Sequence, residues 1–329
     1  MRLRRWLVLF GANIALAGSA TAQSTEKVWV IGVLSTYARP ASFEAHPLYG
    51  PLLRRLRELG YFEGKNLRFE WAFADGSDQR LNELAADLVA RHVDAIVTAA
   101  TPGIRASQTA TRTIPIVFVG GVDAVKQGFV QSLSHPGGNT TGFSFLIAES
   151  TEKQVEILKG FVPRLTRVGY LFSPENPAGV LLAAICRKAT EKLGGQMVPL
   201  EIRSRDEIET AVATAPTLHV DALVCGTDLF LLDAFALVAK ASASHGLPAV
   251  GMFPEFADAG GLVAYGPDRT ETWGRVAAYL DRIFKGEKAG DLPVEQATKL
   301  NLVINRRTAA ALGLTVPPQL LVQADRVID

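Results

Sequence analysis

A six-residue segment occurs twice in this chain of 329 residues and constrains its fold more than any other feature. Residues 92–97 read HVDAIV, and residues 219–224 read HVDALV. A second pair follows in the same order, TIPIVF at 113–118 and GLPAVG at 246–251. Each member runs from a polar helix end into a short apolar segment, which is typical of a buried strand in a parallel sheet. We therefore expect two similar α/β lobes with a cleft between them.

Short apolar segments alternate with helical segments along both halves of the chain. The apolar residues Leu81, Leu84, Ala85 and Leu88 recur at helical spacing, so this segment is expected to cover one face of a sheet. The expected strands lie near 28–35, 66–74, 95–99, 116–120, 167–173, 197–203, 222–226, 249–253, 261–266 and 300–305. This alternation predicts the α/β class, with a doubly wound parallel sheet in each lobe.

The lobe boundaries are expected where turn-forming residues interrupt this alternation. Residues 134–142 read SHPGGNTTG and mark the first boundary. After residue 266 a helical segment is expected at 270–285, followed by an extended link and the last strand, so the chain is expected to cross between the lobes three times. The predicted division is 23–142 plus 267–292 for the N-terminal lobe, and 143–266 plus 293–329 for the C-terminal lobe.

The first 22 residues have the pattern of a secretory signal peptide. Arg2, Arg4 and Arg5 precede an apolar run over residues 6–16, and the small residues Ala20 and Ala22 suit cleavage after Ala22. The apolar run is shorter than the roughly 20 residues that a membrane-spanning helix needs. A soluble periplasmic protein is the expected product.

Charge and cysteine content narrow the expected partners. The net charge is +1, or −2 once the three arginines of the signal peptide are removed, and the charges are interspersed, so nucleic acid is not an expected partner. Cys186 and Cys225 could pair in an exported protein. Because Cys186 falls within an expected helix, two buried free thiols are the simpler interpretation.

Several sequence blocks resemble one family across nearly all of the mature chain. The blocks are PGGNTTG at 136–142, RVGYLF at 167–172, FADAGGL at 256–262, YGPD at 265–268, LPVEQ at 292–296 and LVIN at 302–305. They are similar to the substrate-binding proteins of ABC transporters, and more narrowly to the tryptophan-uptake-like branch of the type I periplasmic binding fold. The resemblance implies two lobes with three crossovers, a small ligand in the cleft, and an ABC permease in the inner membrane as partner. We also expect a monomer without a cofactor.

The expected ligand site follows from the parallel sheets, since ligands of such folds bind beyond the carboxyl ends of the strands. A small polar or aromatic ligand, either an amino acid or an aromatic acid, is expected there. The candidate residues of the first lobe are Ser35, Thr36, Tyr37, Thr98, Ala100, Thr101, Gly121 and Asp123. Those of the second lobe are Ser173, Glu175, Asn176, Thr227, Asp228, Phe253 and Tyr265.

The internal repeat sharpens this expectation, because an offset of 127 residues maps Thr101 onto Asp228. A hydroxyl facing a carboxylate across the cleft suits an α-amino acid, whose ammonium seeks a charged acceptor. Two simpler alternatives stay open. Asp228 could cap the helix expected to begin near Leu229, and the aromatic candidates Tyr37, Phe253 and Tyr265 could be packing residues.

Enzyme motifs are absent from the sequence: it contains no HExxH, GxSxG, phosphate-binding loop or dinucleotide fingerprint. His92 and His219 precede strands, which places them at the sheet end opposite the cleft, and no histidine has metal-ligand spacing. We therefore expect no catalytic residue and no metal. Two alternatives remain, namely a hydrolase or isomerase that uses Glu175, Asp228 or Glu255 as acid and base, and a ligand-sensing module.

Overall fold

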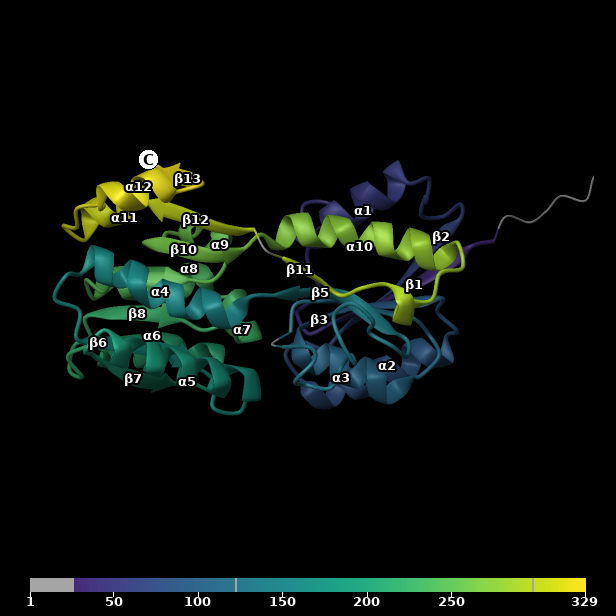
Figure 1. The fold of residues 1–329 in the computed structure, drawn as a ribbon, viewed down its shortest axis with the longest axis horizontal. Helices are drawn as coiled ribbons and strands as arrows, with labels where there is room; N and C mark the ends of the chain where they lie inside the picture. Colours follow the sequence, from purple (N-terminus) through teal and green to yellow (C-terminus); the bar gives the residue numbers. More distant parts are fainter. Residues whose placement is uncertain (1–26, 122, 298) are drawn as a thin grey trace, which may run out of the picture.

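The structure is a computed structural model that describes residues 27–121, 123–297 and 299–329, arranged as two lobes side by side (Figure 1). The expected signal peptide at 1–22 lies outside the described residues. Within them, no helix combines the length and the apolar character that crossing a membrane requires.

The first lobe is built on a parallel six-stranded sheet, ordered β11-β5-β4-β3-β1-β2. Its strands are β1 (Trp29–Ser35), β2 (Leu67–Phe73), β3 (Ala95–Ala99), β4 (Ile116–Val119), β5 (Thr140–Phe145) and β11 (Glu295–Ala297). Helices α1 (Tyr49–Glu58) and α10 (Arg269–Phe284) lie together on one face, and α2 (Asp78–Ala90) and α3 (Ala100–Ala110) lie on the other (Figure 1). Both faces are thus covered, as the apolar strands require.

The second lobe has a seven-stranded sheet, ordered β13-β12-β10-β9-β8-β6-β7, in which only the β10–β12 pair is antiparallel. Its strands are β6 (Arg167–Phe172), β7 (Gln196–Glu201), β8 (Ala222–Cys225), β9 (Ala249–Gly251), β10 (Val263–Pro267), β12 (Leu300–Asn305) and β13 (Arg326–Ile328). The remaining helices are α4 (Ile147–Phe161), α5 (Pro177–Lys192), α6 (Ile208–Thr214), α7 (Leu229–Leu232), α8 (Phe235–Ser244), α9 (Pro254–Asp258), α11 (Arg306–Ala311) and α12 (Pro318–Gln323), with short 3-10 turns η1 (Arg205–Glu207) and η2 (Ala289–Asp291).

The repeated hexapeptide performs the same structural task in each lobe. His92 and His219 adopt left-handed φ angles of 54° and 52°, which turn the chain out of a helical segment and into a strand. The aspartate two residues later then fastens the neighbouring strand. Asp94 accepts a 2.8 Å hydrogen bond from the Val30 N–H, and Asp221 accepts one of the same length from the Arg167 N–H. Both histidines precede their strands, so their expected place at the sheet end opposite the cleft is confirmed.

The expected lobe boundaries at 142 and 292 are too early. Strand β5 continues to Phe145, and β11 pairs with it through Glu295–Phe143 and Ala297–Phe145, so both segments belong to the sheet of the first lobe. The turn-forming residues before 142 mark the start of a strand, and the chain leaves the lobe only where that strand ends. The three crossings therefore follow β5, β10 and β11.

The third crossing is tied to the first lobe before it leaves. The Thr141 hydroxyl donates to the Leu292 carbonyl at 2.7 Å, and the Tyr279 hydroxyl on α10 donates to the Pro293 carbonyl at the same distance. The ring of Tyr279 packs against Phe143 of β5, with centroids 4.8 Å apart. These contacts hold two of the crossings and helix α10 together as one unit.

Cys186 and Cys225 are both buried and free, as the simpler interpretation predicted. Burial raises the pKa of the Cys186 thiol to about 12 and also raises the pKa of Cys225. Both therefore remain neutral thiols of the second core.

Candidate ligand-binding site

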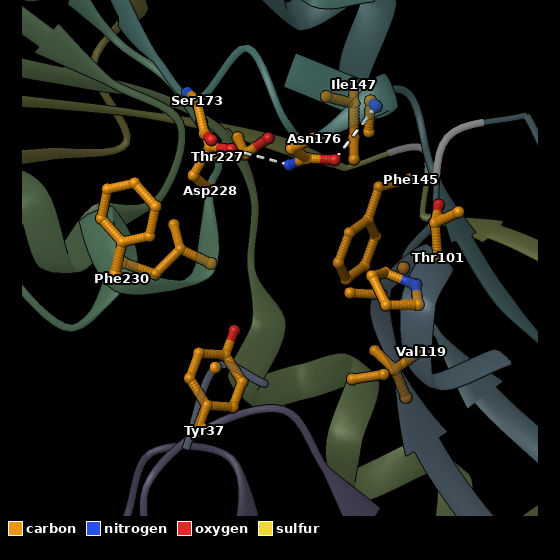
Figure 2. A pocket seen from close by; sticks show the side chains of 18 of the residues that line it. Tyr37, Thr101, Val119, Phe145, Ile147, Ser173, Asn176, Thr227, Asp228 and Phe230 are labelled. Atoms are coloured by element: carbon orange, nitrogen blue, oxygen red, sulfur yellow. Dashed lines mark hydrogen bonds between the residues drawn. The ribbon is translucent and has the colours of Figure 1, made fainter. Parts of the chain in front are cut away.

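A cavity of about 260 Å³ lies between the lobes and is lined from both sides by residues that follow the carboxyl ends of strands (Figure 2). Ten of the residues predicted from the sequence line it. They are Tyr37, Ala100, Thr101, Gly121, Ser173, Glu175, Asn176, Thr227, Asp228 and Phe253. The cavity therefore coincides with the region in which the parallel sheets predicted a ligand.

The first lobe presents the beginning of helix α3 to this cavity. Ala100 has a left-handed φ of 59°, so the chain turns sharply after β3. The start of α3 lies at the cavity wall without a side-chain cap, and it offers the N–H groups of Ala100 and Thr101 but none from Pro102. The Thr101 hydroxyl is buried there and has no hydrogen-bond partner among the described residues. An uncapped helix start with a free hydroxyl favours an anionic or acceptor group.

The second lobe presents a buried carboxylate, that of Asp228, whose residue is 1% exposed. One carboxylate oxygen accepts a 2.8 Å bond from the Asn176 side-chain amide (Figure 2), and the other accepts a 3.1 Å bond from the Ser173 N–H. Asn176 in turn caps helix α5, because its amide oxygen accepts from the Ala178 N–H. Asp228 thus anchors the loop that begins α5.

Asp228 also lines the cavity, although helix α5 packs closely against it. A Cβ at Gly179, in the first turn of α5, would lie 3.3 Å from one Asp228 oxygen, so this glycine lets the helix approach the carboxylate closely. Helix α7, which follows Asp228, is held by the Asp228 backbone carbonyl, since the N–H groups of Leu231 and Leu232 donate to it. The carboxylate therefore engages α5 and the cavity rather than the helix that was expected to need a cap.

Burial raises the pKa of Asp228 above its ordinary value, although the hydrogen bonds from Asn176 and Ser173 act in the opposite direction. A carboxylate in this position gains most from a positively charged partner, because such a partner restores the stabilisation that burial removes.

The other five predicted residues are not among the residues that line the cavity. Thr98 is fully buried and donates to the Leu34 carbonyl, and the Ser35 hydroxyl oxygen accepts from the Tyr49 hydroxyl at 2.8 Å. Asp123 forms an ion pair with Lys126. Thr36 and Tyr265 are also not among the lining residues. Successive strand residues point to opposite faces, so a run of candidates at a strand end cannot all reach one cavity.

Sequence reasoning missed several aromatic residues and two arginines in the cavity wall. The missed lining residues include Phe145, Phe230, Trp273, Arg203 and Arg269. Trp273 and Arg269 belong to α10. The sequence pattern of this segment indicates a helix packed on a sheet, and the internal sequence repeat contains no second copy of the segment. Nothing in the local pattern distinguishes a cavity-lining position of such a helix from a core position.

Arg269, the first residue of α10, connects the two lobes at the cavity wall. Its guanidinium donates to the Glu255 carboxylate of α9 at 2.9 Å and to the Tyr37 hydroxyl of the first lobe at 3.3 Å. Its Cζ lies 4.2 Å from the centroid of the Phe253 ring. Burial lowers the pKa of Arg269, but Tyr37 and Glu255 outweigh that effect and raise it, so the wall carries a permanent cation.

The described part of the chain contains no group of three or more His, Cys, Asp or Glu side chains that could hold a metal ion. The polar groups that line the cavity include the buried Asp228 carboxylate, the Thr101 hydroxyl, the start of α3 and the Arg269 guanidinium, and aromatic rings line it beside them. This arrangement can bind a small zwitterion that has an apolar body.

Known proteins resemble this chain over most of its length. A tyrosine-binding protein of Clostridioides difficile (strain R20291) is 24% identical over 262 residues, which cover 80% of this chain and 75% of the relative. The crystal structure of a conserved domain protein from Vibrio cholerae has 29% identity and a TM-score of 0.83, covering 92% of this chain and all of that one. An ABC domain from Streptococcus pneumonia, solved with L-Trp, has 26% identity and a TM-score of 0.81 over the same shares.

A family model agrees with these likenesses and with the two-lobed architecture. The model for the ABC transporter substrate binding protein family matches residues 39–328, which is most of the chain. The neighbouring structures share the type I periplasmic binding fold that the sequence blocks suggested. The chain belongs to the ABC transporter substrate-binding protein family.

Proposed function

We propose that this protein captures an amino acid with an aromatic side chain in the cavity between its lobes and delivers it to an ABC permease. The observation that carries the proposal is the pairing of Asp228 with the start of α3 and Thr101, which line one cavity from opposite lobes. The carboxylate suits the ligand's ammonium, and the hydroxyl with the helix N–H groups suits its carboxylate.

The apolar part of the wall supports an aromatic side chain. Five aromatic residues line the cavity, and they come from both lobes and from the crossings between them: Tyr37, Phe145, Phe230, Phe253 and Trp273. Aromatic rings pack favourably edge to face or offset-stacked on such walls. Two relatives support the same class, since one is a tyrosine-binding protein and the other was solved with L-Trp.

The carboxylates that could serve an enzyme each have a different partner. Glu175 is exposed beside Arg203 at 3.7 Å, Asp228 is held by Asn176 and Ser173, and Glu255 pairs with Arg269. General acid–base chemistry needs a carboxyl group that is free to exchange a proton with the substrate. Because each of these carboxylates already interacts with a different partner, a binding function is favoured over catalysis.

The place and partners of the protein follow from the family and from the first 22 residues. We infer export to the periplasm through a cleaved signal peptide, action as a monomer, and delivery to the permease of an importer in the inner membrane. The family supports a small-molecule ligand and a permease partner, while the sequence pattern of residues 1–22 supports export.

A thermal-shift screen of the mature protein tests the ligand class. L-Tryptophan and L-tyrosine should raise the melting temperature, because a ligand that binds only the folded state stabilises it. Indole-3-propionic acid, which has the ring and carboxylate of tryptophan but no ammonium, should give a much smaller shift. An equal shift with indole-3-propionic acid would contradict the role of Asp228, and no shift with any aromatic amino acid would contradict the proposal.

A further inference from the structure

We propose that Arg269 is a specificity-determining residue that recognises the aromatic ring of the ligand through the face of its guanidinium. This inference rests on the proposed function and adds to it the group that selects an aromatic over an aliphatic side chain.

A guanidinium can bind partners along its N–H edges or across its two faces. In Arg269 one terminal nitrogen donates to Glu255 at 2.9 Å and the other donates to Tyr37 at 3.3 Å. The remaining donor, Nε, is buried and has no hydrogen-bond partner among residues 27–121, 123–297 and 299–329. Two of the five N–H groups are therefore engaged by protein partners, and Nε is buried.

The faces of the guanidinium are differently placed. Its Cζ lies 4.2 Å from the centroid of the Phe253 ring, so one face is directed at that ring. Arg269 nevertheless contributes to the cavity wall, together with Tyr37 and Phe253. An aromatic ring placed against the opposite face of the guanidinium would complete a stack of Phe253, guanidinium and ligand.

The charges around Arg269 argue for a ring rather than an anion at this position. Glu255 is paired with Arg269, and the exposed Asp233 also lies within electrostatic range of it. An anionic ligand group next to Arg269 would meet two carboxylates. A neutral ring has no such penalty, and its negative face is attracted to the cation.

Tryptophans with zero to three fluorine atoms on the indole ring test this inference, because each fluorine weakens the negative face of the ring. Calorimetric titration of the wild-type mature protein should show affinity falling stepwise with fluorine number if the ring lies on a cation. Affinities that do not change along the series would overturn the inference, whereas absence of binding by unmodified tryptophan would overturn the proposed function as well.

The double variant R269M/E255Q removes the cation without leaving a lone buried charge. We expect it to bind tryptophan about 10-fold more weakly than the wild type. Its fluorinated series should be flat, a result that a merely structural role of Arg269 would not produce. A series as steep as that of the wild type would overturn the inference.

The matched control is R282M/E287Q, at the other end of the same helix. Arg282 pairs with Glu287 at 2.7 Å and lies 5.9 Å from the Tyr279 ring centroid, but neither residue of the pair lines the described cavity. This variant should keep the affinity and the slope of the wild-type series. A flattened slope in the control would show that loss of any ion pair on α10 has this effect, and would overturn the assignment to Arg269.

Discussion

The Asp228 carboxylate links the folding of the second lobe to the binding of a ligand. It accepts bonds from Asn176 and Ser173, and it lines the cavity at the same time. The removal of this side chain would therefore affect two properties, because the partners at the start of α5 lose their acceptor and the ligand loses its charged partner.

Asp228→Ala should weaken binding of an aromatic amino acid by about 2–5 kcal/mol, the range for loss of one member of a buried charged pair. It should also lower the free energy of unfolding by about 1–3 kcal/mol, because the Asn176 amide and the Ser173 N–H are left without an acceptor. Calorimetric titration and urea unfolding measure the two effects.

Asp221→Ala is the matched control for that substitution. Asp221 lies just before the same strand, β8, and its carboxylate also accepts backbone N–H groups, but at the end of the sheet away from the cavity. This variant should lose stability and keep its affinity. Unchanged affinity in Asp228→Ala would refute the ligand role of Asp228.

The raised pKa of Asp228 gives binding a pH dependence. As the pH falls through the folded-state pKa, Asp228 becomes protonated and loses its attraction for an ammonium group. Affinity should therefore begin to fall at a pH above 3.8, the ordinary value for this carboxyl. Titrations at a series of pH values measure this decline, and Asp228→Asn, which carries no charge at any of them, should lack it.

The stability of the ligand-free protein should respond to pH in the opposite direction. The folded state holds the Asp228 proton more tightly than the unfolded chain does, so the contribution of this group to stability falls as the pH rises from 3.8 through the folded-state pKa. Denaturant unfolding without ligand, compared between wild type and Asp228→Asn, isolates this contribution. A contribution that grows with pH would contradict the raised pKa.

Among the elements, β5 shows most clearly how close packing fixes a crossing. Gly142 lies in this strand between β4 and β11, and a Cβ at that position would collide with the backbone of Phe118. Backbone cannot move aside as a flexible side chain can, so only glycine fits between these strands.

Gly142→Ala should lower the free energy of unfolding by about 1–3 kcal/mol or more, as expected for overpacking against a rigid neighbour. Gly274→Ala is the matched control. Gly274 lies within α10, and its added Cβ would meet only Pro51, at 3.9 Å, so this change should be neutral or stabilising by up to about 1 kcal/mol. Equal stability of the two variants in urea unfolding would contradict the packing described for β5.

The elements themselves were largely predictable, because their signals are local. The strand expected at 95–99 and the one at 300–305 occur with those bounds. The lobe to which a crossing segment belongs was not predictable in the same way. Pairing of Glu295 with Phe143 joins residues far apart in the sequence, and no local pattern specifies that partner.

The part of the site that lies at the carboxyl ends of the parallel strands was predictable from the sequence. Thr101 and Asp228 follow equivalent strands, and both line the cavity. Arg269 and Trp273 could not be assigned, since helix α10 reaches the cavity only through its packing on the first lobe after the chain has crossed from the second.

At the scale of the whole molecule, the two lobes divide the recognition of a ligand between them. The hydroxyl and helix start come from the first lobe, and the carboxylate comes from the second, so neither half-site can hold a zwitterion alone. Three crossings join the lobes. During hinge motion, a few residues in such connections take up the change in backbone φ and ψ angles. The ligand is expected to bring the lobes together.

Small-angle X-ray scattering of the mature protein, without ligand and saturated with L-tryptophan, tests this account most directly. Binding is first verified by calorimetry, so that the saturated sample is known to be occupied. Closure of the lobes about the crossings after β5, β10 and β11 predicts a smaller radius of gyration in the saturated sample. Identical scattering curves with and without bound tryptophan would contradict capture of the ligand between closing lobes.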